Sequence, residues 1–353
     1  MKTKTLTTLF LLCIIQTGLS QLTFVPDDNF EQALIDLGYD SGPLDDYVLT
    51  ANIDTVLSLN VSAENIQNLT GIEGFSSLEA LICNNNQLTN LDVSLNTMLL
   101  ALWCGNNQLT SLDVSQNTSL TSLVISFNDI TNIDVSLNIA LTGLFSLGTQ
   151  LNTLDVSNNP SLEFLYCQNN FITDLDLSQN VFLQGLHIDN NQLIELDVSQ
   201  SLELHDIQCS NNQLTNLDLR NGNNSNVTND DFNSLNNPNL TCIFVDDAAY
   251  STANWSDIDP TNTFVETEAA CNALSVSHFD ESLFRIYPNP ADNELFIRAT
   301  EPFKKATVYS MQGQKVLENT SESIDVSKLN AGIYILFIEG MSGQGAVIHF
   351  IKK

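Results

Sequence analysis

Residues 99–119 read LLALWCGNNQLTSLDVSQNTS, and this pattern recurs seven times without insertion between residues 78 and 224. Every unit has 21 residues and opens on a leucine. The opening residues are Leu78, Leu99, Leu120, Leu141, Leu162, Leu183 and Leu204. A fixed short period predicts a solenoid, in which each unit buries its apolar face against its neighbours. Such a scaffold presents a long ordered surface, so the functional question is what that surface binds.

Each unit consists of two similar halves, and positions are counted here from the opening leucine. In both halves three apolar positions are followed by asparagine. In residues 99–119 these positions hold Leu99, Leu102, Cys104 and Asn107, and then Leu109, Leu112, Val114 and Asn117. Both halves alternate in the manner of a short strand. We therefore expect parallel sheets on both faces of a flat coil, with little helix.

Asparagine at position 9 is nearly constant, with Thr149 as the one replacement. It is found at Asn86, Asn107, Asn128, Asn170, Asn191 and Asn212. After an inward strand the chain must turn across the edge of the core, which leaves backbone groups unpaired. An inward amide can donate to and accept from successive turns. We predict a structural asparagine ladder.

The pattern LxxLxCxxNxLxxLDVSxN over residues 78–224 resembles the leucine-rich repeat family, in particular the bacterial 21-residue class with nested half-repeats called IRREKO-type. Residues 56–77 resemble one internalin-like repeat of 22 residues, and residues 239–245 resemble a last strand. The resemblance implies recognition of a protein or glycan on the strand-lined face, without catalysis. Solenoid ends need caps. We expect a helix within residues 25–38 at one end, and a cover with Tyr250 and Trp255 at the other.

Charge divides the chain. Residues 21–279 contain 33 Asp and Glu against one basic residue, Arg220, whereas residues 280–353 are nearly neutral. The contrast predicts a domain boundary near residues 275–282. This strongly negative electrostatic field disfavours binding of nucleic acid and anionic lipid, and it favours cations or basic partners.

Residues 1–20 read as a secretory signal, with Lys2 and Lys4 ahead of an apolar stretch. No later segment is apolar enough to span a bilayer.

Six cysteines follow the signal. Four share position 6, which holds isoleucine or serine in the other units, namely Cys83, Cys104, Cys167 and Cys209. This exchange favours small buried hydrophobes. Cys242 and Cys271 lie outside the regular units of an exported protein, and we predict that they form a disulfide that closes the end of the solenoid.

Position 5 faces outward in the first strand of each unit and yet is mostly apolar or aromatic. It holds Ile82, Trp103, Val124, Phe145, Tyr166, His187 and Gln208, called here the position-5 row. Position 3 beside it is mostly small, which predicts rings standing along a shallow groove. An exposed apolar stripe usually marks an interface. We predict a ligand site, with Trp103, Phe145 and Tyr166 as anchors. The alternative is that a flanking loop or the terminal domain covers this apolar row.

Position 15 is aspartate in all seven units and faces outward. This Asp column consists of Asp92, Asp113, Asp134, Asp155, Asp176, Asp197 and Asp218. The simpler interpretation is a solvated ladder bonded to backbone amides. The alternative is a row of bound calcium ions, because calcium prefers oxygen ligands. A further alternative is a metal site of His187, Asp189, Asp206 and Gln208. No catalytic motif was found.

From Phe284 onward the period is lost, and short strands separated by turns predict a small antiparallel sandwich. This segment resembles the C-terminal sorting domain of type IX secretion cargo, type A. The matching pieces are Tyr287-Pro288-Asn289-Pro290, residues 308–316, residues 329–336 and Lys352-Lys353. The resemblance implies export through the type IX machinery, followed by release or attachment to the outer cell surface.

These observations predict a mainly β protein without enzymatic activity. Its predicted parts are a signal (1–20), an N-terminal helical cap (21–55), a leucine-rich-repeat solenoid (56–250), a C-terminal cap and linker (251–279) and a sorting domain (280–353). The predicted function is recognition or adhesion through a protein or glycan partner, without a cofactor. The alternative is a structural surface protein stabilised by cations such as calcium.

Overall fold

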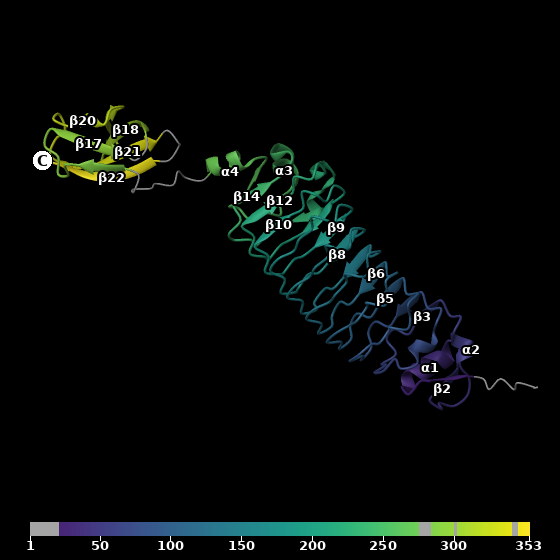
Figure 1. Cartoon of the computed structure of the whole chain (residues 1–353). Helices are drawn as coiled ribbons and strands as arrows, with labels where there is room; N and C mark the ends of the chain where they lie inside the picture. The colour runs from purple at the N-terminus through teal and green to yellow at the C-terminus, as the bar shows by residue number, and fades with distance from the viewer. Residues whose placement is uncertain (1–20, 275–283, 300–301, 341–344) are drawn as a thin grey trace, which may run out of the picture. The chain divides into compact units, whose positions relative to one another are not determined.

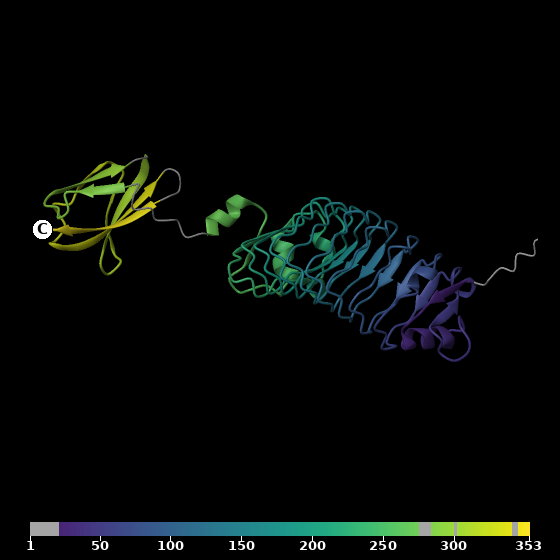
Figure 2. The same ribbon diagram turned by 60° about the horizontal axis from the view of Figure 1, so that its bottom comes forward.

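The structure is a computed structural model that describes residues 21–274, 284–299, 302–340 and 345–353 (Figures 1 and 2). The predicted signal and the predicted domain boundary lie outside these residues. The chain divides into two compact units, Met1–Glu266 and Thr267–Lys353. Within the described ranges, no helix is long and apolar enough to cross a membrane.

A nine-stranded parallel sheet runs along one side of the first unit, in the order β13-β11-β9-β8-β7-β6-β5-β4-β3 (Figure 1). Equivalent residues of successive units pair with one another, as in Leu81 with Leu102 and Leu102 with Leu123. The strands are β3 (Ser58–Asn60), β4 (Ala80–Ile82), β5 (Ala101–Trp103), β6 (Ser122–Val124), β7 (Gly143–Phe145), β8 (Phe164–Tyr166), β9 (Gly185–His187), β11 (Asp206–Gln208) and β13 (Phe232–Asn233). The predicted parallel solenoid is confirmed.

The second sheet is shorter than predicted, because it forms only toward the C-terminal end of the solenoid. Its strands are β10 (Glu195–Asp197), β12 (Asn216–Asp218), β14 (Cys242–Phe244) and β15 (Thr263–Val265). In earlier units the carbonyl of position 16 is used by asparagine side chains, as where Val93 O accepts from Asn117 Nδ2 at 2.9 Å. After β10 the position of this asparagine holds Ser201, whose hydroxyl donates to Asn180 O at 3.2 Å, and Val198 N donates to Asp218 O at 3.0 Å where the sheet forms.

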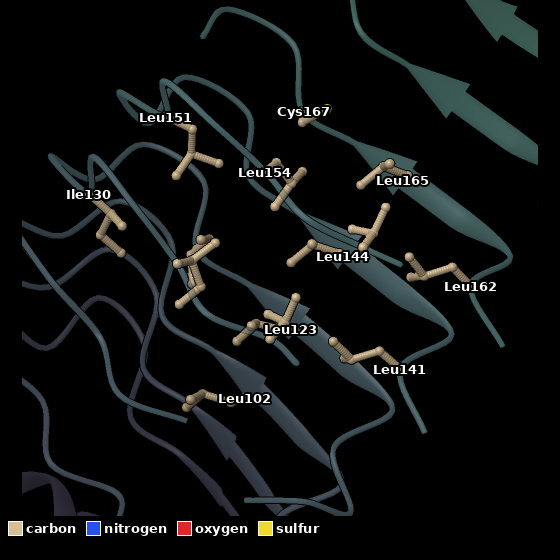
Figure 3. Packing of buried hydrophobic residues seen from close by; sticks show 14 of the residues in the cluster. Leu102, Leu123, Ile130, Leu141, Leu144, Leu151, Leu154, Leu162, Leu165 and Cys167 are labelled. Atoms are coloured by element: carbon tan, nitrogen blue, oxygen red, sulfur yellow. The ribbon is translucent and has the colours of Figure 1, made fainter. Parts of the chain in front are cut away.

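The core lies between the sheet and the opposite half of each coil. Leucines of positions 1 and 4, such as Leu141 and Leu144, point inward, and Leu154 points inward from the opposite half (Figure 3). The four position-6 cysteines are buried and free. Burial raises the pKa of the Cys104 thiol to about 12, which keeps it protonated and unreactive. The cysteines are therefore buried hydrophobes, as predicted.

The asparagine ladder is confirmed. Asn128 Oδ1 accepts from Leu109 N of the preceding unit at 2.9 Å, and its Nδ2 donates to Ile125 O and Cys104 O at 2.9 and 3.1 Å. The other position-9 asparagines repeat this arrangement. Thr149 keeps part of it, because its hydroxyl lies 2.7 Å from Asn170 Oδ1 and donates to Ser146 O. Each amide thus joins two successive turns.

Position 8 has a positive φ in every unit. It is occupied by Asn85, Asn106, Phe127, Gly148, Asn169, Asn190 and Asn211. Asparagine and glycine are the residues that adopt this left-handed conformation most readily. Phe127, at φ 56°, is the exception.

The N-terminal cap contains β1 (Leu22–Phe24), α1 (Asp28–Asp36), β2 (Tyr47–Leu49) and α2 (Thr50–Ile53), and η1 (Ile72–Gly74) follows β3. Asp27 begins the helix, since its Oδ1 accepts from Asn29 N and Phe30 N. Its other oxygen accepts from Gln67 N at 2.8 Å. One carboxylate therefore ties the predicted helical cap to the first coil.

The C-terminal cap begins with η2 (Asn224–Asn226) and η3 (Asn229–Asp231) and continues with α3 (Ala248–Asn254). Trp255, just after α3, is 3% exposed and stacks on Phe232 with ring centroids 4.5 Å apart. The Tyr250 hydroxyl donates to Ser225 O at 3.0 Å. Both predicted residues thus cover the last coil.

The second unit holds α4 (Glu268–Leu274) and two antiparallel sheets. One sheet has the order β16-β17-β20 and the other β19-β18-β21-β22. Their strands are β16 (Phe284–Tyr287), β17 (Glu294–Ala299), β18 (Phe303–Ser310), β19 (Lys315–Asn319), β20 (Ser323–Asp325), β21 (Gly332–Gly340) and β22 (Gly345–Lys352). Their buried side chains, including Phe284, Leu295 and Leu336, form a core separate from that of the solenoid.

Candidate recognition face

The position-5 row lies on the outer face of the nine-stranded sheet. The middle residue of each strand is buried, so its first and third residues face outward. The strand register sets each member beside the next, as in Phe145 beside Tyr166 and Tyr166 beside His187. Trp103 is 38% exposed, and the other members are partly exposed. The structure thus brings all seven predicted residues into one row.

The rings of neighbouring coils contact one another along this row. Tyr166 and His187 stack with centroids 4.1 Å apart and planes at 11°. Phe145 meets Tyr166 edge to face at 5.3 Å, and Phe164 of position 3 does so at 6.2 Å. Such contacts contribute roughly 0.5–1.5 kcal/mol each beyond burial. They hold the rings in fixed orientations.

The predicted shallow groove is wrong at the two glycines of position 3. A methyl group added to Gly143 would lie 2.8 Å from the Phe145 ring, and one added to Gly185 would lie 3.0 Å from the Tyr166 hydroxyl oxygen. These rings therefore lie down on the sheet, in the space that a larger side chain would fill. Trp103 is held by its indole N–H, which donates to Ser122 Oγ at 3.0 Å.

A polar network continues the row at its C-terminal end. His187 Nε2 lies 2.7 Å from Asp206 Oδ2, and His187 Nδ1 lies 3.2 Å from Gln168 Nε2. Asp189 is engaged elsewhere, since its Oδ1 accepts from the amide and hydroxyl of Ser210. Across the part of the chain that the structure describes, no three His, Cys, Asp or Glu side chains are grouped to hold a metal ion.

The Asp column lies on the opposite half of the coils. Asp92 Oδ1 accepts from Ser94 N at 2.9 Å, and Asp113, Asp134, Asp155, Asp176 and Asp197 make the equivalent contact. Asp218 makes the same contact with Arg220 N at 3.1 Å and in addition pairs with the Arg220 guanidinium. A shallow hollow of about 680 Å³ is lined by Asp134, Asp155 and Asp176. These contacts fit the amide-bonded ladder.

Hydrogen bonds from the Ser115 hydroxyl and then from its backbone N–H lower the pKa of Asp113 below its ordinary value of 3.8. A carbon-13 titration should therefore give Asp113 a pKa below 3.8, and Ser115→Ala should raise it. Because the folded pKa lies below the unfolded one, this contribution to stability is present above about pH 4. It is lost as the pH falls through the folded pKa. A wild-type pKa at or above 3.8 would contradict the assignment.

Cys242 and Cys271 are both disulfide-bonded in the structure. The bond between these two cysteines remains a prediction. Peptide mapping by mass spectrometry, with and without reductant, tests it.

Two exposed aromatic residues that follow strands of the sheet were not predicted from the sequence. Phe127 follows β6 and Phe171 follows β8, and each is 50% exposed. Position 10, which Phe171 occupies, is polar in every other unit: Gln87, Gln108, Asp129, Gln150, Gln192 and Gln213. Phe127 and Phe171 each stand where the other units have a different type of residue, and this departure is the sequence signal that marks them.

Residues 285–353 match the family model of the secretion system C-terminal sorting domain. Internalin C2 of Listeria monocytogenes aligns with a TM-score of 0.55 and 22% identity over 62% of this chain and 98% of that chain. A second internalin of that bacterium, inlF, aligns with a TM-score of 0.50 and 18% identity over 73% of this chain and 96% of that chain. A search of curated proteins finds no match.

The structural likeness shows the leucine-rich-repeat solenoid fold. The sorting-domain match indicates type IX secretion to the cell surface or the surroundings of the cell.

Proposed function

We propose that this protein is an exported recognition or adhesion protein, and that the position-5 row binds its protein or glycan partner. The observation that carries the proposal is the run of partly exposed rings, Trp103, Phe145 and Tyr166, on one rigid sheet face. Trp and Tyr are the residue types most enriched in binding hot spots. Export by a sorting domain supports a partner outside the cell.

The fixed orientation of the rings favours binding over simple exposure. Tyr166 is held by contacts with His187, Phe145 and Phe164, and Trp103 by its bond to Ser122. Side chains that are already ordered lose little entropy when a partner binds, which strengthens the complex. The proposal is for a binding protein rather than an enzyme.

The test compares the wild-type exported protein with a Trp103→Ala/Phe145→Ala/Tyr166→Ala variant on purified glycans and cell-surface proteins. We expect the variant to lose binding by at least about a hundredfold, because anchor residues contribute roughly 2 kcal/mol or more each. Its melting temperature should fall by several degrees, because the ring contacts of the row are lost while the core stays intact, so binding is compared well below both melting temperatures. Phe182→Ala, at a turn residue that is 53% exposed, is the matched control.

Equal binding by the wild type and the triple variant would overturn the proposal. The structural alternative would then gain support, and a rise of the melting temperature with added calcium would favour it.

A further inference from the structure

The first unit carries negative charge that its own residues do not neutralise. Between residues 21 and 274, Arg220 is the one Lys or Arg. Its guanidinium donates to both oxygens of Asp218 and lies over the Phe244 ring at 4.8 Å. The remaining carboxylates create a negative potential that attracts cationic partners. An anionic or merely neutral ligand gains nothing from this field.

Apolar rings and carboxylates occur together at the C-terminal end of the position-5 row. Asp206 lies at hydrogen-bond distance from His187, which stacks on Tyr166. Burial and then the charge of Asp206 raise the pKa of the Tyr166 phenol. Lys and Arg side chains fit such a surface, because each has an apolar stem and a charged head. Their charged groups also bind ring faces.

We propose that the partner on the position-5 row is a basic protein segment, whose Lys and Arg stems lie on Phe145 and Tyr166 and whose charges face the surrounding carboxylates. This inference rests on the proposed function and selects protein over glycan. A neutral glycan would use the rings but would leave the negative field without a role.

Phe127 extends this contact surface beyond the row. Its φ of 56° is costly for a bulky residue, and the other units place asparagine or glycine there. It is 50% exposed, and its ring lies 3.0 Å from where a side chain on Gly148 would begin. Strain held in an exposed aromatic residue is typical of binding sites. Phe171, two units further on, is a second aromatic residue that is 50% exposed.

The test measures binding of poly-L-lysine by calorimetry to the exported protein and to three variants, with poly-L-glutamate and neutral dextran as comparison ligands. The variants are Phe127→Asn, Phe145→Ala/Tyr166→Ala and the off-site control Phe182→Asn. None of them changes the net charge. We expect the first two to bind poly-L-lysine about tenfold more weakly, and the control to bind like the wild type. Binding should weaken as salt is raised.

Phe127→Asn should melt about 2–4 °C higher than the wild type, because the strain is removed. Higher stability with weaker binding is the result that a structural role for Phe127 would not give. A lower melting temperature would overturn the role of Phe127, and the double variant would still test the row.

Equal binding of poly-L-lysine by all variants would show attraction by net charge alone and overturn the inference. Binding of dextran through the row would overturn it too, while leaving the proposed recognition function in place.

Discussion

Replacing Asn128 by alanine should lower the free energy of unfolding by about 3 kcal/mol, because buried backbone groups lose their partners. Asn128 is 4% exposed, and its side chain forms hydrogen bonds with the backbone of two successive turns. Its loss would leave Leu109 N and Ile125 O unpaired, whereas Cys104 O keeps its bond from Asn107. In a solenoid each unit contacts only its neighbours, so the damage should be greatest in the two coils that the amide joins.

Chemical denaturation of three variants tests this. Asn128→Thr should fall between alanine and the wild type, because Thr149 shows that a hydroxyl replaces part of the amide. Asn132→Ala, at an exposed residue, should change stability by less than about 0.5 kcal/mol. Equal stability of Asn128→Ala and Asn132→Ala would mean that the ladder contributes little.

The sequence predicted the first sheet because a constant 21-residue period places equivalent residues in register. The second sheet could not be predicted so well, because its half-repeats have the same alternation. What differs is the use of backbone groups. In an earlier unit the side chain of Asn117 donates to Val93 O, whereas at the second sheet the backbone N–H of Val198 donates to Asp218 O. This difference depends on backbone geometry that alternation does not encode.

The position-5 row was visible from strand alternation, and the structure places its members side by side. The orientation of the rings was not predictable, because it depends on which neighbour leaves space. Phe145 lies over Gly143 in its own strand, whereas Tyr166 lies over Gly185 of the next. The departure of Phe127 from the repeat was visible in the sequence, but its strain appeared only with the backbone conformation of position 8.

The C-terminal cap should depend on Trp255 more than on any other residue of its segment. Besides its stack on Phe232, the ring meets Phe264 at 5.5 Å, and its N–H donates to Val227 O at 3.0 Å. Trp255→Ala removes this buried ring, so we expect a loss of about 3–5 kcal/mol in the free energy of unfolding. Phe232 belongs to β13 and Phe264 to β15, so both sheets lose their terminal support.

The chain offers its own control, because its second tryptophan, Trp103, is 38% exposed on the recognition face. Trp103→Ala should cost about 1–2 kcal/mol, clearly less than Trp255→Ala, because its ring is partly exposed and its removal leaves no cavity in the core. Hydrogen exchange locates the effect: Trp255→Ala should speed exchange in β11–β15 and leave β4–β6 protected, because stability in a solenoid passes only between neighbours. Faster exchange throughout the solenoid would show a single cooperative unit, and unchanged exchange would show that Trp255 does not hold the cap.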